Sequence, residues 1–175
     1  VQGLSKYKNR TTGVSSSAAK YASAFALGSV IFEKFDSEFA ESMKKKAVDA
    51  MAYAEAIPGA CQTACVVSPY FYEEDNWIDD MELAAVALHL MEPENEYWLQ
   101  RANYWGDLEP IPPWMETGKA RHYQWYPFVN LGHYLIAAEG TEAQKAKFAG
   151  YMREGLQHIL DRAGDDPFVH GVPYL

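Results

Sequence analysis

The connections between the predicted helices alternate between short and long, and this alternation constrains the fold more than any other feature. Apolar residues recur at helical spacing in six stretches. Short links lie near Asp36, Glu92 and Gly140. The other two connections, residues 58–75 and 106–126, are each about twenty residues long, well above the usual length in a compact domain. Because short links join antiparallel neighbours, the pattern predicts three antiparallel hairpins with both long loops on one face.

Local signals predict where each helix begins and ends. Capping side chains and prolines favour six helix starts, at Ser15, Asp36, Asn76, Pro93, Pro127 and Thr141. Residues 141–144 (TEAQ) have the spacing of a capping box. The stop signals are Pro58-Gly59, Gly140 and Gly164.

In each predicted pair the first helix has fewer charges than the second. The stretch after Ser15 is rich in Ala and Ser and reaches its first acidic residue at Glu33, whereas the stretch after Asp36 has one apolar and one charged face. Helices with little charge are typically buried all round. We therefore expect an all-α fold, a toroid of hairpins with apolar inner and amphipathic outer helices, of which three hairpins form an incomplete ring.

Length and charge exclude several classes of protein. A chain of 175 residues with 49% hydrophobic residues is typical of one globular domain. Its formal net charge of -9 argues against nucleic acid or an anionic membrane as a partner, since both need a basic face. Cys61 and Cys65 are compatible with a local disulfide and equally with two buried thiols, and they lack the partners of a zinc site. We expect no cofactor and no metal.

The stretch 68–90 (SPYFYEEDNWIDDMELAAVALHL) combines loop aromatics, acidic residues and a helix start. Aromatic rings beside carboxylates suit a sugar, whose C–H faces stack on rings and whose hydroxyls bind charged acceptors. Simpler alternatives are an aromatic plug over the core and acidic residues that favour a helix N-terminus. A calcium site would need about six or more oxygen ligands.

Four runs together resemble the glycoside hydrolases of family 9, which include endoglucanases with an (α/α)6 barrel. They are residues 8–13 (KNRTTG) with 17–19 (SAA), 36–40 (DSEFA), 76–85 (NWIDDMELAA) and 171–174 (GVPY). The resemblance covers nearly the whole chain. It implies that residues 1–175 form a single, partial domain, about half of such a barrel and lacking both ends, that the chain continues into further elements, and that the protein is secreted, periplasmic or at the cell surface.

The resemblance implies hydrolysis of a β-1,4-glucan, cellulose-like, with inversion, and a set of substrate-binding residues. These are Tyr70, Phe71, Tyr72, Glu74, Trp77, His122 and Trp125. His122 has the alternative of a plain loop residue; the other histidines, His133 among them, are given no role. The expected partners are a polysaccharide or oligosaccharide and the remainder of the same catalytic domain.

Inversion needs a carboxylic acid and a carboxylate base on opposite sides of the scissile bond. The family takes the base from an Asp-Ala-Gly-Asp motif and the acid from a distant Glu, and neither segment is expected in this chain. Residues 161–165 (DRAGD) imitate the motif with one residue too many. We therefore expect no catalytic residue here and no activity of the chain alone. The rival hypothesis is a non-catalytic helical-hairpin module that binds carbohydrate or protein through its aromatic loops.

Overall fold

The computed structural model describes residues 11–61, 76–113, 115–116 and 130–171, which contain six helices and no strand. The helices are α1 (Ser15–Phe32), α2 (Ser37–Ala56), α3 (Ile78–Met91), α4 (Glu96–Leu108), α5 (Leu131–Glu139) and α6 (Glu142–Asp165). The prediction of an all-α fold is therefore confirmed.

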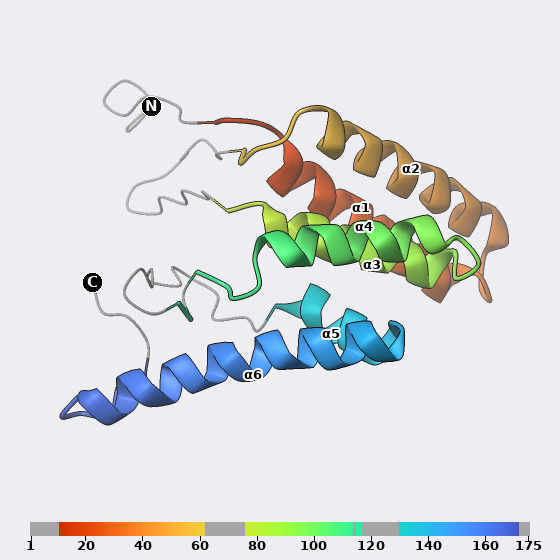
Figure 1. The fold of residues 1–175 in the computed structure, drawn as a ribbon. Coiled ribbons are helices and arrows are strands. Elements are labelled where there is room, and N and C mark those ends of the chain that lie inside the picture. Colours follow the sequence, from red (N-terminus) through yellow and green to blue (C-terminus); the bar gives the residue numbers. More distant parts are fainter. Residues whose placement is uncertain (1–10, 62–75, 114, 117–129, 172–175) are drawn as a thin grey trace, which may run out of the picture.

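The helices form three antiparallel hairpins, α1–α2, α3–α4 and α5–α6, arranged side by side (Figure 1). The first helices of the hairpins also pack on one another, α1 on α3 and α3 on α5. Helix α3 is thus covered on both sides, and every residue from Ala84 to Leu88 is fully buried. On the side of α3 that faces α1, the side chains of α1 in this core are mainly Ala, which lets the backbones of α1 and α3 approach closely.

Two predicted helix starts are confirmed by their hydrogen bonds. The carboxylate of Asp36 accepts from the backbone N–H of Phe39 at 2.9 Å and caps α2. Thr141 and Gln144 form the predicted capping box at the start of α6. Both caps depend only on residues within one turn, which is why the sequence alone reveals them.

One other predicted helix start is wrong. Helix α4 begins at Glu96 rather than at Pro93, because Asn95 supplies the cap by accepting from the N–H of Tyr97. Helix α5 begins at Leu131 with Asn130 as its cap, and Pro127 lies outside the described residues. Gly164 lies at the C-terminal end of α6 as predicted, one residue before the last helical residue, Asp165.

The cap of α3 differs in detail from the prediction. The residue at the cap position is Trp77, whose side chain accepts no capping hydrogen bond. The amide oxygen of Asn76 instead accepts from the N–H of Trp77 at 2.9 Å and of Ile78 at 3.4 Å. The predicted side chain thus binds the helix start from one position further out.

The helix ends that border the long connections lie at the same end of the bundle (Figure 1). Around the start of α1, Val14 N–H donates to the Ile57 carbonyl at 2.9 Å, and the buried Ser15 hydroxyl donates to the Ala54 carbonyl at 2.7 Å. Gly59 adopts a φ of 141° there, and a Cβ on it would lie 2.6 Å from the backbone nitrogen of Gly13. We call this end of the bundle the loop end.

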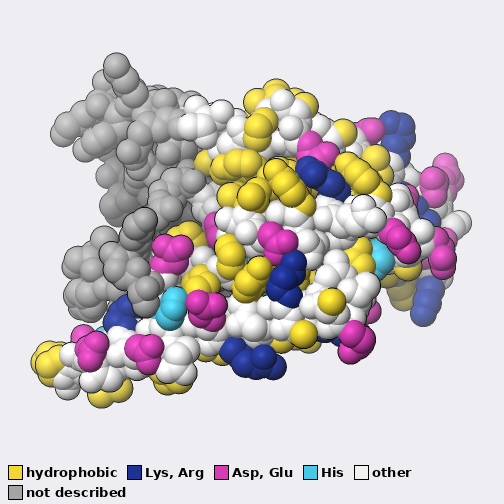
Figure 2. All heavy atoms as spheres, in the orientation of Figure 1, with side chains coloured by type: hydrophobic (Ala, Val, Ile, Leu, Met, Phe, Trp, Pro, Cys, Tyr) yellow, Lys and Arg dark blue, Asp and Glu magenta, His cyan; other side chains and the backbone are white. Residues whose placement is uncertain are grey.

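Charges of both signs are mixed on the described surface. On the face drawn in Figure 2, Lys and Arg side chains are scattered among Asp and Glu rather than gathered into one basic area. Within the described ranges, no helix is long and apolar enough to cross a bilayer.

Candidate functional site

Of the seven predicted substrate-binding residues, the structure describes only Trp77. The other six, Tyr70, Phe71, Tyr72, Glu74, His122 and Trp125, lie outside the described residues. Their assignment to a sugar cleft therefore stays a prediction from the sequence. Cys65 also lies outside the described part, so the question of a Cys61–Cys65 disulfide stays open.

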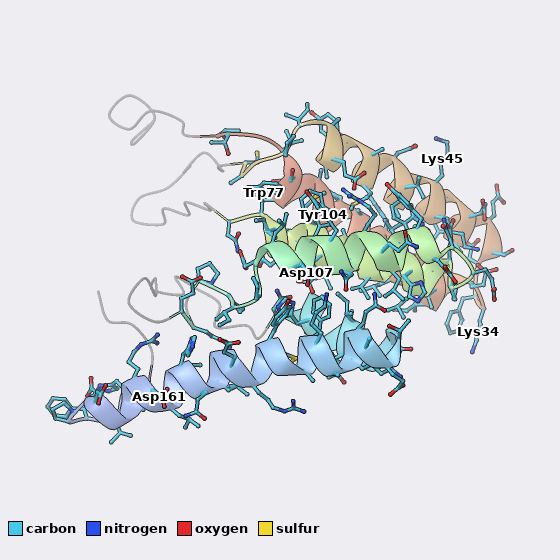
Figure 3. All side chains as sticks on the ribbon, in the orientation of Figure 1. Lys34, Lys45, Trp77, Tyr104, Asp107 and Asp161 are labelled. Carbon is cyan, nitrogen blue, oxygen red and sulfur yellow. The ribbon has the colours of Figure 1, made fainter. Side chains whose placement is uncertain are left out.

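Trp77 lies at the loop end, directly before α3 (Figure 3). Its ring is half-buried and meets the ring of Trp105 edge to face, with 5.6 Å between the centroids. One part of the indole therefore packs on the hydrophobic core, which fixes its orientation.

Asn76 and Glu109 tie the start of α3 to the end of α4. The side-chain amide of Asn76 donates to Glu109 Oε1 at 3.1 Å, while its oxygen holds the first N–H groups of α3. This link closes the second hairpin at the loop end and keeps Trp77 beside Trp105.

A buried polar cluster lies below the loop end, on α3 and α5. Glu82 is fully buried, His133 is 1% exposed and Asn130 is 7% exposed. His133 Nδ1 lies 2.7 Å from Glu82 Oε1, and the Asn130 amide donates to Glu82 Oε2 at 3.0 Å. His133 Nε2 lies 2.9 Å from the carbonyl oxygen of Pro110, two residues after α4. Both carboxylate oxygens of Glu82 thus have a partner.

Both titratable groups of this cluster, the carboxyl group of Glu82 and the imidazole of His133, have a raised pKa. Burial raises the pKa of Glu82 above its ordinary range, and the hydrogen bonds and charge of His133 and the amide of Asn130 offset only part of that effect. Burial alone would lower the pKa of His133, but the hydrogen bond to Glu82, the charge of its carboxylate and the Pro110 carbonyl raise it overall.

The hydrogen bond to Pro110 determines which nitrogen of His133 bears a proton. A backbone carbonyl can only accept, so Nε2 must be the donor in that bond. One further proton then lies between Nδ1 and Glu82, either on the imidazolium or on the carboxylic acid. Glu82 therefore fixes the orientation of the ring and the donor at Nε2.

Aromatic rings and a second polar group close the cluster on the side of α6. The ring of His133 contacts Phe148 and Tyr151 at centroid distances of 5.0 and 5.5 Å. The Tyr151 hydroxyl donates to Asp107 at 3.1 Å, and Lys147 pairs with the same carboxylate at 2.7 Å. These contacts exclude water from His133 and join the second and third hairpins.

Glu82 and His133 were not identified from the sequence, which gave His133 no role. The available signal was that Glu82 stands among residues that are otherwise apolar from Met81 to Leu88. A charge inside such a run needs a buried partner, but the sequence does not show that the partner lies 51 residues away.

Asp161 does not occupy a site of this kind. It lies on the exposed surface of α6 and accepts from the Gln157 amide at 2.7 Å, within the same helix (Figure 3). Asp165, the last residue of the run that imitates the family motif, is exposed as well. Among the residues that the structure describes, no group of three or more His, Cys, Asp or Glu is placed to hold a metal ion.

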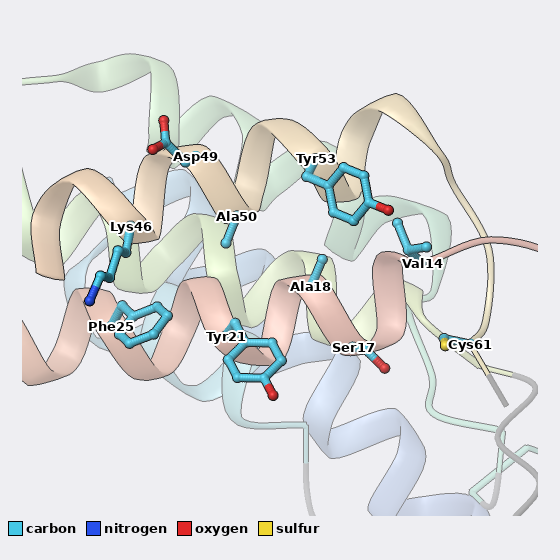
Figure 4. Close-up of a pocket in the computed structure, with 10 residues that line it drawn as sticks. All are labelled: Val14, Ser17, Ala18, Tyr21, Phe25, Lys46, Asp49, Ala50, Tyr53 and Cys61. Carbon is cyan, nitrogen blue, oxygen red and sulfur yellow. The ribbon is translucent and has the colours of Figure 1, made fainter. Parts of the chain in front are cut away.

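A groove of 390 Å³ lies between α1 and α2 (Figure 4). Its lining is mostly apolar and includes Tyr21, Phe25 and Tyr53, with Lys46 and Cys61 at opposite ends (Figure 4). Lys46 Nζ lies 5.7 Å from the centre of the Phe25 ring. Trp77, the one predicted substrate-binding residue that the structure describes, does not line this groove.

The chain is similar to a known protein family. The family model described as glycosyl hydrolase family 9 matches residues 2–168 of the 175. No curated protein and no solved structure matches the chain.

Proposed function

The chain belongs to glycosyl hydrolase family 9, and we propose that it forms part of a catalytic domain that hydrolyses a β-1,4-glucan with inversion at the anomeric carbon. In this proposal the chain supplies walls of the substrate cleft. The sugar is held at the loop end by Trp77 and by the aromatic and acidic residues predicted from the sequence.

The observation that supports this proposal most strongly is the position of the ends of the long connections. Residues 61 and 76 flank one undescribed stretch, and residues 116 and 130 flank another. Figure 1 shows that α2 and α4 end, and α3 and α5 begin, towards the loop end. Side chains borne by the two connections can therefore contribute to one common surface, as a cleft that holds several sugar units requires.

Two carboxylates of the second hairpin, Glu82 and Glu109, are bound to other side chains of the protein. Inversion requires two carboxyl groups that reach the glycosidic bond and a water molecule from opposite sides. Glu82 is fully buried with both oxygens bound, and Glu109 is hydrogen-bonded to Asn76. The printed sequence contains no Asp-Ala-Gly-Asp run. We therefore propose that the acid and the base come from other segments of the domain, and that the chain alone does not hydrolyse glucan.

Because a polymeric glucan does not enter cells intact, the proposal also places the protein outside the cytoplasm, as a secreted, periplasmic or cell-surface enzyme. Its partners are then the polysaccharide and the remaining elements of the same domain.

Two assays on the 175-residue chain test the proposal. Isothermal titration calorimetry should detect binding of cellohexaose and much weaker binding of the matched β-1,4-mannan hexamer. A reducing-sugar assay on soluble β-1,4-glucan should detect no hydrolysis. Absence of any binding preference for the glucan would contradict the binding role. Hydrolysis that persists in an Asp161→Asn/Asp165→Asn variant would contradict the claim that the proton-transfer groups lie elsewhere.

A further inference from the structure

Three prolines limit the backbone hydrogen bonds that the stretch after α4 can donate. Residues 109–116, which we call the proline segment, contain Pro110, Pro112 and Pro113, none of which has an N–H group. In its described part, Met115 N–H donates to the Pro112 carbonyl at 2.8 Å. Contacts from α5 and α6 also hold the described part of the segment.

Side chains of His133 and Arg162 donate hydrogen bonds to backbone carbonyls of the proline segment, one towards each end. His133 Nε2 donates to the Pro110 carbonyl at 2.9 Å. Arg162 of α6 donates to the Glu116 carbonyl at 2.6 Å and to the Gly171 carbonyl at 2.6 Å. Between them, the side chain of Met115 is 2% exposed and packs against α6, where a Cβ on Gly155 would lie 2.7 Å from its sulfur.

Glu82 stands at the centre of these contacts because it binds both flanks of the undescribed stretch 117–129. One oxygen holds the amide of Asn130, the residue that follows this stretch and caps α5. The other oxygen orients His133, which holds Pro110 in the segment that precedes the stretch. A single buried carboxylate thus contacts Asn130 directly and Pro110 through His133.

We propose that Glu82 is a positioning residue for the two flanks of residues 117–129. It holds the start of α5 through Asn130, and it holds Pro110 through the Nε2–H of His133. It acts through these two residues and does not touch substrate. Its consequence for glucan affinity rests on the proposed function, whereas the positioning itself does not.

The proposal requires hydrogen bonding at Glu82, not its negative charge. In a Glu82→Gln variant the amide oxygen can still accept from Asn130, and the amide N–H can donate to a neutral His133 Nδ1, which leaves the proton on Nε2. In Glu82→Leu both contacts are lost. Glu82→Gln is therefore the matched control, of nearly the same size and with the same two contacts.

The direct test is nuclear magnetic resonance on the chain with 15N-labelled histidine. We expect a slowly exchanging Nε2–H for His133 in the wild type and in Glu82→Gln, and its loss in Glu82→Leu. Amide hydrogen exchange gives the second readout: in Glu82→Leu the Met115 amide should exchange at least about tenfold faster, since a buried contact has been removed, while the Met51 amide of α2 stays unchanged.

The outcomes separate this proposal from the proposed function. An Nε2 without a proton in the wild type, or a Glu82→Gln variant that behaves like Glu82→Leu, would overturn the positioning role. If Glu82→Leu does not fold, the wild type and Glu82→Gln still decide the question. A wild type with the protected Nε2–H but no affinity for cellohexaose supports the positioning role and contradicts only the glucan-binding function.

Discussion

Replacement of Gly132 by Ala tests how tightly α5 packs on the buried carboxylate. Gly132 is in the first turn of α5, and a Cβ at this position would lie 2.7 Å from both Cγ and Cδ of Glu82. Real Cβ contacts are essentially never this short. Either α5 must move away from α3 or Glu82 must shift, and both changes disturb its 2.7 Å contact with His133 and its 3.0 Å bond from Asn130.

The expected magnitude follows from two opposing effects. Alanine stabilises a helix by about 0.5–1 kcal/mol relative to glycine. Overpacking a filled core destabilises by about 1–3 kcal/mol, and a disturbed buried pair adds to that loss. We therefore expect Gly132→Ala to lower the free energy of unfolding by about 1–3 kcal/mol.

Gly150 supplies the matched control, because it lies inside α6 and a Cβ there would meet nothing within 4 Å. Gly150→Ala should raise the free energy of unfolding by about 0.5–1 kcal/mol through helix propensity alone. Urea unfolding followed by circular dichroism measures both variants. If Gly132→Ala gains as much stability as Gly150→Ala, the close packing of α5 on Glu82 is wrong.

Three further variants or conditions probe other contacts. Thr141→Ala removes the capping box of α6 and should lower the free energy of unfolding by about 0.5–2 kcal/mol in the same urea assay. Ser15→Ala removes a buried hydroxyl that binds the Ala54 carbonyl at 2.7 Å and should cost about 1–3 kcal/mol; an unchanged midpoint would contradict either assignment. The pKa of His133 in the folded state is raised above 6.5, its ordinary value in the unfolded chain, so the folded state keeps a proton that the unfolded chain loses. The resulting stabilisation is present below pH 6.5 and is lost as pH rises through the pKa of the folded state. The stability difference between the wild type and the Glu82→Gln/His133→Gln variant, which titrates at neither position, should therefore shrink above pH 6.5, and a constant difference would contradict the raised pKa.

The hairpin arrangement was predictable because it depends on local features and on chain length. Short links force neighbouring helices to be antiparallel, and caps such as Asp36 act within one turn of their own helix. Pro93 misled the prediction because a proline only tolerates a helix start, whereas Asn95 provides the acceptor that the first N–H groups need.

The buried cluster could not be predicted, because its contacts join distant parts of the chain. Glu82 meets His133 across 51 residues, and His133 reaches Pro110 across 23. Helical periodicity places each side chain on a face of its own helix but does not show which helix covers that face. For the candidate cleft, the sequence supplied seven residues, and the structure shows the packing of Trp77 alone among them.

The most direct test of the central claim, that the loop end holds a glucan, compares Trp125→Ala with Trp98→Ala. Trp98 is buried at the opposite end of the second hairpin, where its indole N–H donates to Glu92 at 3.0 Å. Its replacement by Ala should lower the free energy of unfolding by about 3–5 kcal/mol, and with it the unfolding midpoint. Trp125 is predicted to stack on sugar, a contact that contributes on the order of 0.5–1.5 kcal/mol.

Cellohexaose affinity by calorimetry, measured beside the thermal unfolding midpoint of each variant, separates these two roles. The account predicts that Trp125→Ala weakens affinity by roughly two- to tenfold and leaves the midpoint nearly unchanged, whereas Trp98→Ala lowers the midpoint and leaves the affinity of the folded protein unchanged. A Trp125→Ala variant with a sharply lowered midpoint and wild-type affinity would show that the ring is core packing and would contradict the claim.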